Sequence, residues 1–122
     1  MAILNLTQHT ATDDQQAAGV FDASDEIREV IRGLLTFDEC PTPWGIADRA
    51  KALVAIANQH RPLDGVMIGG APWLMGALER ALAEAGIQPR YSFSRRESVE
   101  QVQPDGSVRK VNVFRHAGWV AV

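Results

Sequence analysis

The hydrophobic and polar positions of this chain follow two different periods. Continuous apolar runs at residues 2–6 and 65–69 have the length and composition of buried strands. Elsewhere apolar residues recur at spacings of three and four, the period of an amphipathic helix. This spacing predicts helices at residues 27–35, 43–59 and 72–85. A capping-box pattern at Thr12-Asp-Asp-Gln15 predicts a short helix at 13–18, before a short strand at 20–22.

The last third of the chain changes to a period of two, which is typical of strands. Residues 90–94 alternate, with Tyr91 and Phe93 on one side, and residues 108–114 alternate again. Between them stands Asp105-Gly106, the strongest short signal for a hairpin turn. We therefore expect an antiparallel pair joined at this turn, and a final strand or tail at 118–122.

The order of these elements predicts an α/β fold. Strands separated by helices favour a Rossmann-like sandwich with a mostly parallel sheet, closed by an antiparallel C-terminal hairpin. We expect Ile3–Leu6 and Val66–Ile68 to be parallel and adjacent or nearly so. At 122 residues the chain has the length of a single domain, residues 1–122.

The passage from the second apolar run into the next helix is the first candidate for a binding site. Ile68-Gly69-Gly70-Ala71-Pro72 reads as a strand that passes into a helix through a tight turn. Ligands of open α/β sheets bind beside the carboxyl ends of the strands, where helix N-termini offer free N–H groups. The alternative is a turn required only for tight packing. The stretch is neither a P-loop nor the Gly-x-Gly-x-x-Gly dinucleotide fingerprint.

Two further sets of polar residues follow predicted strands and are expected at the same edge of the sheet. Hydroxyls, amides, imidazoles and guanidinium groups are suited to holding phosphate or carboxylate. The predicted ligand-binding residues are Asn5, Thr7, Gln8, Gly69, Gly70, Ala71, Ser94, Arg95 and Arg96, and the predicted catalytic residues are His9, Lys110 and His116. The alternative is that His9 and the arginines are separate surface residues.

Composition limits the classes of function. A formal net charge of −3 argues against a protein that coats duplex nucleic acid, but it leaves room for a small anionic ligand such as a nucleotide or oligonucleotide. The single Cys40 cannot form an internal disulfide, which fits a reducing cytoplasm. We expect no signal peptide, no membrane span, no metal site and no cofactor, and the sequence leaves a homodimer open.

Four motifs spread over the chain carry a resemblance. They are Asn5-Leu-Thr-Gln-His9, Ile68-Gly-Gly-Ala-Pro72, Phe93-Ser-Arg-Arg-Glu-Ser98 and Lys110-Val-Asn-Val-Phe114-Arg-His116. In these motifs the chain resembles an uncharacterised family of small bacterial and prophage proteins, over nearly its whole length. That resemblance implies little about activity.

The chain is also loosely similar, in element order and loop chemistry, to the CRISPR-associated Rossmann-like (CARF) proteins and their ring-nuclease relatives of antiviral defence. This similarity implies binding of a cyclic oligoadenylate and, in some members, cleavage without metal by the ligand's own 2′-hydroxyl. Amides of Gly69 to Ala71 with Arg95 or Arg96 would hold phosphates, and His9 or His116 would act as general acid or base. Lys110 would stabilise the developing charge.

Three readings of function follow from the sequence. The first is a nucleotide-binding protein that recognises a cyclic or linear oligonucleotide second messenger and cleaves it as a metal-independent phosphodiesterase. The second is a protein that sequesters such a ligand without turnover. The third is an interaction protein of mobile elements, such as an anti-CRISPR-like inhibitor, without enzymatic activity.

Overall fold

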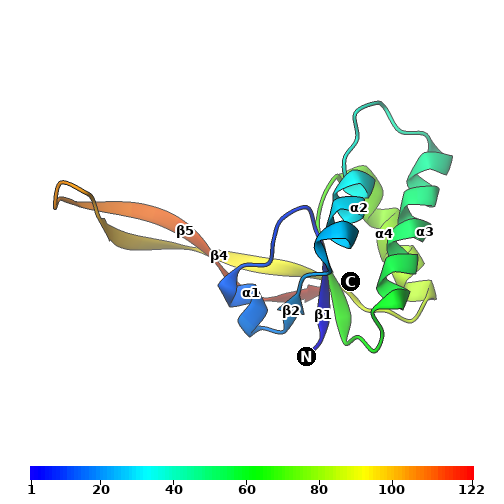
Figure 1. Ribbon diagram of the computed structural model, residues 1–122, viewed down its shortest axis with the longest axis horizontal. Helices are drawn as coiled ribbons and strands as arrows, with labels where there is room; N and C mark the ends of the chain where they lie inside the picture. Colours follow the sequence, from blue (N-terminus) through cyan, green and yellow to red (C-terminus); the bar gives the residue numbers. More distant parts are fainter.

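The computed structural model describes residues 1–122 and contains one five-stranded sheet flanked by helices (Figure 1). In chain order the elements are β1 (Ile3–Leu6), α1 (Asp13–Ala17), β2 (Val20–Phe21), α2 (Asp25–Leu35), α3 (Pro43–Gln59), β3 (Gly65–Ile68), α4 (Pro72–Glu84), β4 (Pro89–Val102) and β5 (Val108–Ala121). Every predicted helix and strand is present, within a residue or two at most ends. The exceptions are β4 and β5, which are much longer than predicted.

The sheet has the order β2-β1-β3-β4-β5. β1 is parallel to both β2 and β3, and β3 is parallel to β4, whereas β4 and β5 are antiparallel. Leu6 and Ile68 are paired neighbours, so β1 and β3 end side by side. The predicted fold class and the predicted parallel pair are therefore confirmed.

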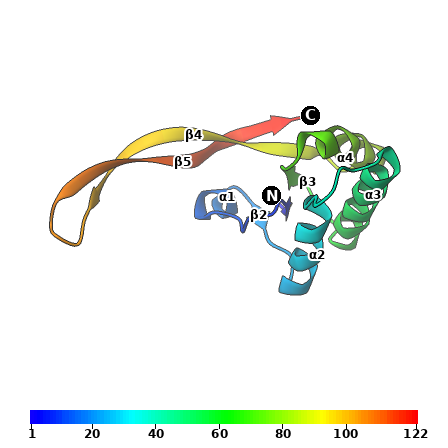
Figure 2. The same ribbon diagram turned by 90° about the horizontal axis from the view of Figure 1, so that it is seen from above.

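The core lies mainly on one face of this sheet. All four residues of β1 and all four of β3 are buried. Leu4, Leu6, Val66 and Ile68 pack with residues of α2, α3 and α4 in a cluster of sixteen buried residues. A smaller cluster on the opposite face contains Ile3, Ala11, Val20 and Met67, with Trp119 packed against it. Figures 1 and 2 agree that α1 lies on the other side of the sheet from the three longer helices.

Local signals explain where the helices begin. Thr12 and Gln15 form the predicted capping box of α1, and Thr42 caps α3 ahead of Pro43. The Ser24 hydroxyl accepts from the Ile27 amide, but Ile27 cannot complete a reciprocal box. No side chain caps α4, which starts at Pro72 after the glycine turn.

The long hairpin of β4 and β5 corrects one prediction. Ser92–Ser98 was expected to leave its strand as a polar run at the site, but it continues β4 without a break. Figures 1 and 2 show the hairpin projecting as an arm well beyond the helices. The predicted turn is confirmed: Gly106 has a φ of +87°, and the Ser107 amide and hydroxyl donate to Asp105 Oδ1 at 2.9 and 2.6 Å.

Candidate functional site

A polar pocket of about 520 Å³ opens at the carboxyl edge of the sheet, where β1 and β3 end. α1 and the passing strand β4 form its other side. Its lining residues are Thr7, Gln8, His9, Thr10, Thr12, Gln15, Met67, Ile68, Gly69, Gly70, Tyr91 and Ser92. No acidic side chain and no lysine or arginine lines it, so its polar groups are hydroxyls, amides and one imidazole.

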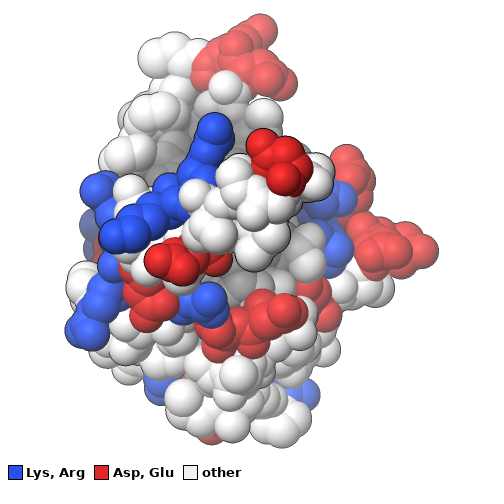
Figure 3. All heavy atoms as spheres, turned by 90° about the vertical axis from the view of Figure 1, so that its left-hand side faces the viewer, with Lys and Arg blue, Asp and Glu red and all other residues white.

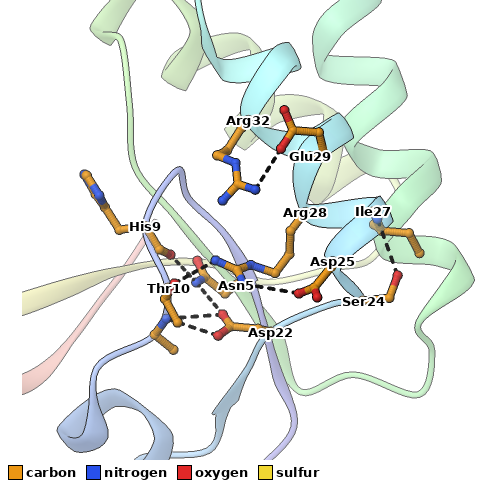
Figure 4. A network of polar contacts seen from close by, with 11 residues as sticks. Asn5, His9, Thr10, Asp22, Ser24, Asp25, Ile27, Arg28, Glu29 and Arg32 are labelled. Atoms are coloured by element: carbon orange, nitrogen blue, oxygen red, sulfur yellow. Dashed lines mark hydrogen bonds and ion pairs between the residues drawn. The ribbon is translucent and has the colours of Figure 1, made fainter.

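Asn5 shapes the loop that follows β1. Its side chain is only 4% exposed, and its Nδ2 donates to the His9 carbonyl at 2.7 Å and to Asp22 Oδ1 at 2.8 Å (Figure 4). Its Oδ1 accepts from the amide and the hydroxyl of Thr7 at 2.9 and 2.7 Å. Because every polar atom of the side chain is already used, Asn5 positions the loop and is not a ligand-binding residue.

Two further contacts hold the same loop in place. The Asp22 carboxylate accepts from the Ala11 amide at 3.2 and 3.3 Å, and Arg28 Nη2 donates to the Thr10 hydroxyl at 2.7 Å. Gln8 Nε2 reaches the end of α2, where it contacts the Leu35 carbonyl and the Thr36 hydroxyl at 3.2 Å each. The His9 side chain is left exposed, and Figure 4 shows its ring directed away from these contacts.

The glycine turn forms the wall beside this loop. Gly70 has a φ of +153°, which side chains rarely adopt, so this position requires glycine. Gly69 does not: a Cβ there would meet only Thr7 Cγ2, at 3.6 Å. The N–H groups of Gly69, Gly70 and Ala71 form no hydrogen bond within the chain. The turn therefore presents unused donors beside an open surface.

The opposite wall joins α1 to β4. Ser92 Oγ lies 2.6 Å from His116 Nδ1 and accepts from Gln15 Nε2 at 3.4 Å. The His116 ring in turn packs on Trp119, with 4.5 Å between ring centroids. Burial, and secondarily Glu79, raises the pKa of the Tyr91 phenol, which keeps its hydroxyl a neutral donor.

The structure brings together some of the predicted residues and separates others. Thr7, Gln8, His9, Gly69 and Gly70 line one pocket, and His116 touches that pocket through Ser92. The residues that do not line it are Asn5, Ala71, Ser94, Arg95, Arg96 and Lys110.

The arm explains why the predicted cations lie outside the pocket. β4 does not end at the edge of the sheet, so every residue after Ser92 lies further along the projecting hairpin. Lys110 pairs with Glu100, eight residues past Ser92, which places it about 26 Å away at strand spacing. Lys110 therefore cannot stabilise charge in this pocket.

Sequence reasoning missed part of the lining, namely Thr10, Thr12, Gln15 and Tyr91. The capping box did place Thr12 and Gln15 at the start of a helix, but nothing in the spacing indicated that this helix faces the glycine turn. No group of three or more His, Cys, Asp or Glu side chains is arranged to hold a metal ion.

Comparisons with known proteins complete the description. No helix has both the length and the apolar character needed to span a membrane. Neither the curated proteins nor the solved structures include a match to this chain. The similarity to CARF proteins therefore stays a prediction. The model of the uncharacterized protein MJ1673 family matches residues 1–120, and the chain belongs to that family.

Proposed function

We propose that this protein binds a nucleotide or short oligonucleotide, cyclic or linear, by its phosphate in the pocket at the carboxyl edge of the sheet. The observation that carries the proposal is the convergence of unused N–H groups at Gly69 and Gly70 with the hydroxyl-bearing loop after β1. Backbone donors and hydroxyls without a neighbouring carboxylate suit an anion, because nothing in the lining repels it.

Size and mixed chemistry favour a nucleotide over a bare inorganic ion. A volume of about 520 Å³ is within the ordinary range for small-molecule sites, which begins near about 300 Å³. The Tyr91 ring and the exposed His9 imidazole add flat surfaces on which a base can stack. The phosphate would lie at the glycine turn and the nucleoside toward Tyr91.

A substitution at Gly69 tests the binding proposal. A Leu side chain at this position keeps an allowed backbone and projects beside Thr7, so Gly69→Leu should fill the pocket without unfolding the protein. Gly33→Leu, on the exposed face of α2 with nothing within 4 Å of a Cβ, is the matched control. Thermal shifts with mononucleotides, cyclic dinucleotides and cyclic oligoadenylates should appear in the parent and the control and vanish in Gly69→Leu. Absence of any shift in the parent protein would reject the proposal.

Cleavage of a bound oligoribonucleotide is a second candidate, favoured by the Ser92–His116 contact of 2.6 Å opposite His9. The ligand's 2′-hydroxyl attacks the adjacent phosphorus while His9 takes its proton. The bond from phosphorus to the 5′-oxygen breaks, and that oxygen receives a proton from Ser92, which His116 replaces. The products are a 2′,3′-cyclic phosphate and a 5′-hydroxyl end.

Product analysis separates cleavage from binding alone. With a chelator present, the parent protein should form the cyclic phosphate, while His9→Ala and Ser92→Ala should bind the ligand and leave it intact. A parent protein that binds but forms no product would reject cleavage and leave sequestration of the ligand as the function.

A further inference from the structure

The arm is the largest part of the molecule that the pocket does not explain. Its two strands have fourteen residues each, and most positions beyond Ser92 are exposed on both faces. Phe114 is 67% exposed and Phe93 is 52% exposed. A two-stranded ribbon without a covering layer is only marginally stable in water. An exposed ribbon of this length points to a binding surface.

Charge is divided unevenly between the arm and the rest of the chain. Residues 89–122 contain six basic and three acidic residues, a formal charge of +3, whereas residues 1–88 contain six basic and twelve acidic residues, a formal charge of −6. Figure 3, seen from the side of the arm, shows a line of basic side chains crossing this end of the molecule. Outward of Phe93, the cations without a carboxylate within 4.0 Å are Arg95, Arg96, Arg109 and Lys110. The arm therefore offers free positive charge to an anionic partner.

One face of the arm is continuous with the pocket. Residues paired directly across the two strands share a face, so the face that begins at Ser92 continues through Ser94 with His116, Arg96 with Phe114, Ser98 with Asn112, and Glu100 with Lys110. We call this the pocket face. The Arg96 guanidinium lies over the Phe114 ring, 5.5 Å from its centroid. Arg95 and Phe93 lie on the opposite face.

We infer that the pocket face binds a single-stranded oligonucleotide whose terminal nucleotide occupies the pocket. This inference rests on the proposed function and extends it to a linear, unpaired ligand. Phe114 provides a surface for base stacking, and Arg96 and Lys110 provide positive charge for the phosphates that follow. Aromatic and basic side chains in alternation along one groove or ribbon are the usual means of holding a single strand.

Two alternative partners fit the arm less well. A duplex would bring a broad negative surface against a body of charge −6, and its paired bases could not enter the pocket. A second copy pairing along the free edge of β5 would align Arg109, Lys110 and Arg115 with their own counterparts, and β5 has no acidic residue to offset them.

A length series tests the inference. Fluorescence anisotropy would measure the affinity for 5′-labelled mono-, di-, tetra- and hexanucleotides of single-stranded RNA. Affinity should rise from the mononucleotide to the tetranucleotide. Phe114→Ala should lower tetranucleotide affinity at least about fivefold, and Arg96→Ala should reduce the salt dependence by about one counterion released, a slope change of about 0.7. Both variants should leave mononucleotide affinity unchanged.

Matched controls stand on the opposite face of the same ribbon. Phe93→Ala and Arg95→Ala remove the same groups and should change tetranucleotide affinity less than twofold. Equal affinity for all lengths, with the mononucleotide still bound, would overturn the inference and leave the proposed function intact. Loss to the same extent in both pairs of variants would also overturn it. No binding at any length would reject the proposed function as well, and a dimer dissociated by Phe114→Ala in sedimentation would assign the face to self-association.

Discussion

At the scale of single residues, Asn5 shows how a buried polar group can be essential to a site it does not touch. Its amide joins the end of β1, the loop at Thr7 and His9, and Asp22, and all four contacts are within 2.9 Å. A short amide next to a strand end reads in sequence as a ligand for an anion. Its near-complete burial instead makes it the support of the pocket loop.

Substituting this residue should therefore cost both stability and binding. Asn5→Leu leaves the Asp22 carboxylate and the Thr7 amide without their partner, and we expect a loss of about 1–3 kcal/mol of unfolding free energy in urea titrations. Thr7→Val, which removes only one hydroxyl of the same group, should cost less. Unchanged stability in Asn5→Leu would show that the loop is held by other contacts.

At the scale of elements, the sequence predicted the body of the protein well because each element there has one buried side. Helical spacing located α2, α3 and α4, and continuous apolar runs located β1 and β3. The lengths of β4 and β5 could not be predicted in this way. Alternation signals a strand only when one face is buried, and the arm buries neither, so Ser92–Ser98 resembled a loop.

The same limit applied to the site. The strand ends at His9 and Gly69 were predicted to meet, since the edge of a parallel sheet gathers them, and both line the pocket. Arg95 and Arg96 were placed there on the assumption that β4 stops at the same edge. Thr12, Gln15 and Tyr91 depend on how α1 and β4 pack against the sheet, which no local pattern encodes.

The hairpin turn should respond to acid. Hydrogen bonds from the Ser107 hydroxyl, and next from its amide, lower the pKa of Asp105. A lowered folded-state pKa means that the contribution to stability is complete above the unfolded pKa and is lost as pH falls through the folded value. Hydrogen exchange at the Ser107 amide should therefore show less protection, after correction for intrinsic rates, as the solution becomes strongly acidic. Asp105→Asn keeps an acceptor that does not titrate and should show constant protection, and an equal loss in both would contradict the assignment.

At the scale of the whole molecule, the body and the arm are held by different kinds of force. The body has a packed core around β1 and β3, whereas the arm contacts it beyond Ser92 through His116 and through the ion pair of Arg115 with Asp14 at 3.7 Å. Exposed ion pairs of this type contribute little to stability. The body should therefore fold without the outer arm.

Shortening the arm tests this division. In a variant whose residues 96–114 are replaced by Asn-Gly, Arg95 and Arg115 remain paired at the new turn, and the Ser92–His116 contact and the ion pair to Asp14 are kept. Because the deleted residues pack against no other element, the melting temperature should stay within about 4 °C of the parent. Mononucleotides should bind as before, and the gain in affinity with oligonucleotide length should disappear. A large loss of stability would show instead that the arm takes part in folding the body, and an unchanged gain with length would place the additional nucleotides elsewhere on the molecule.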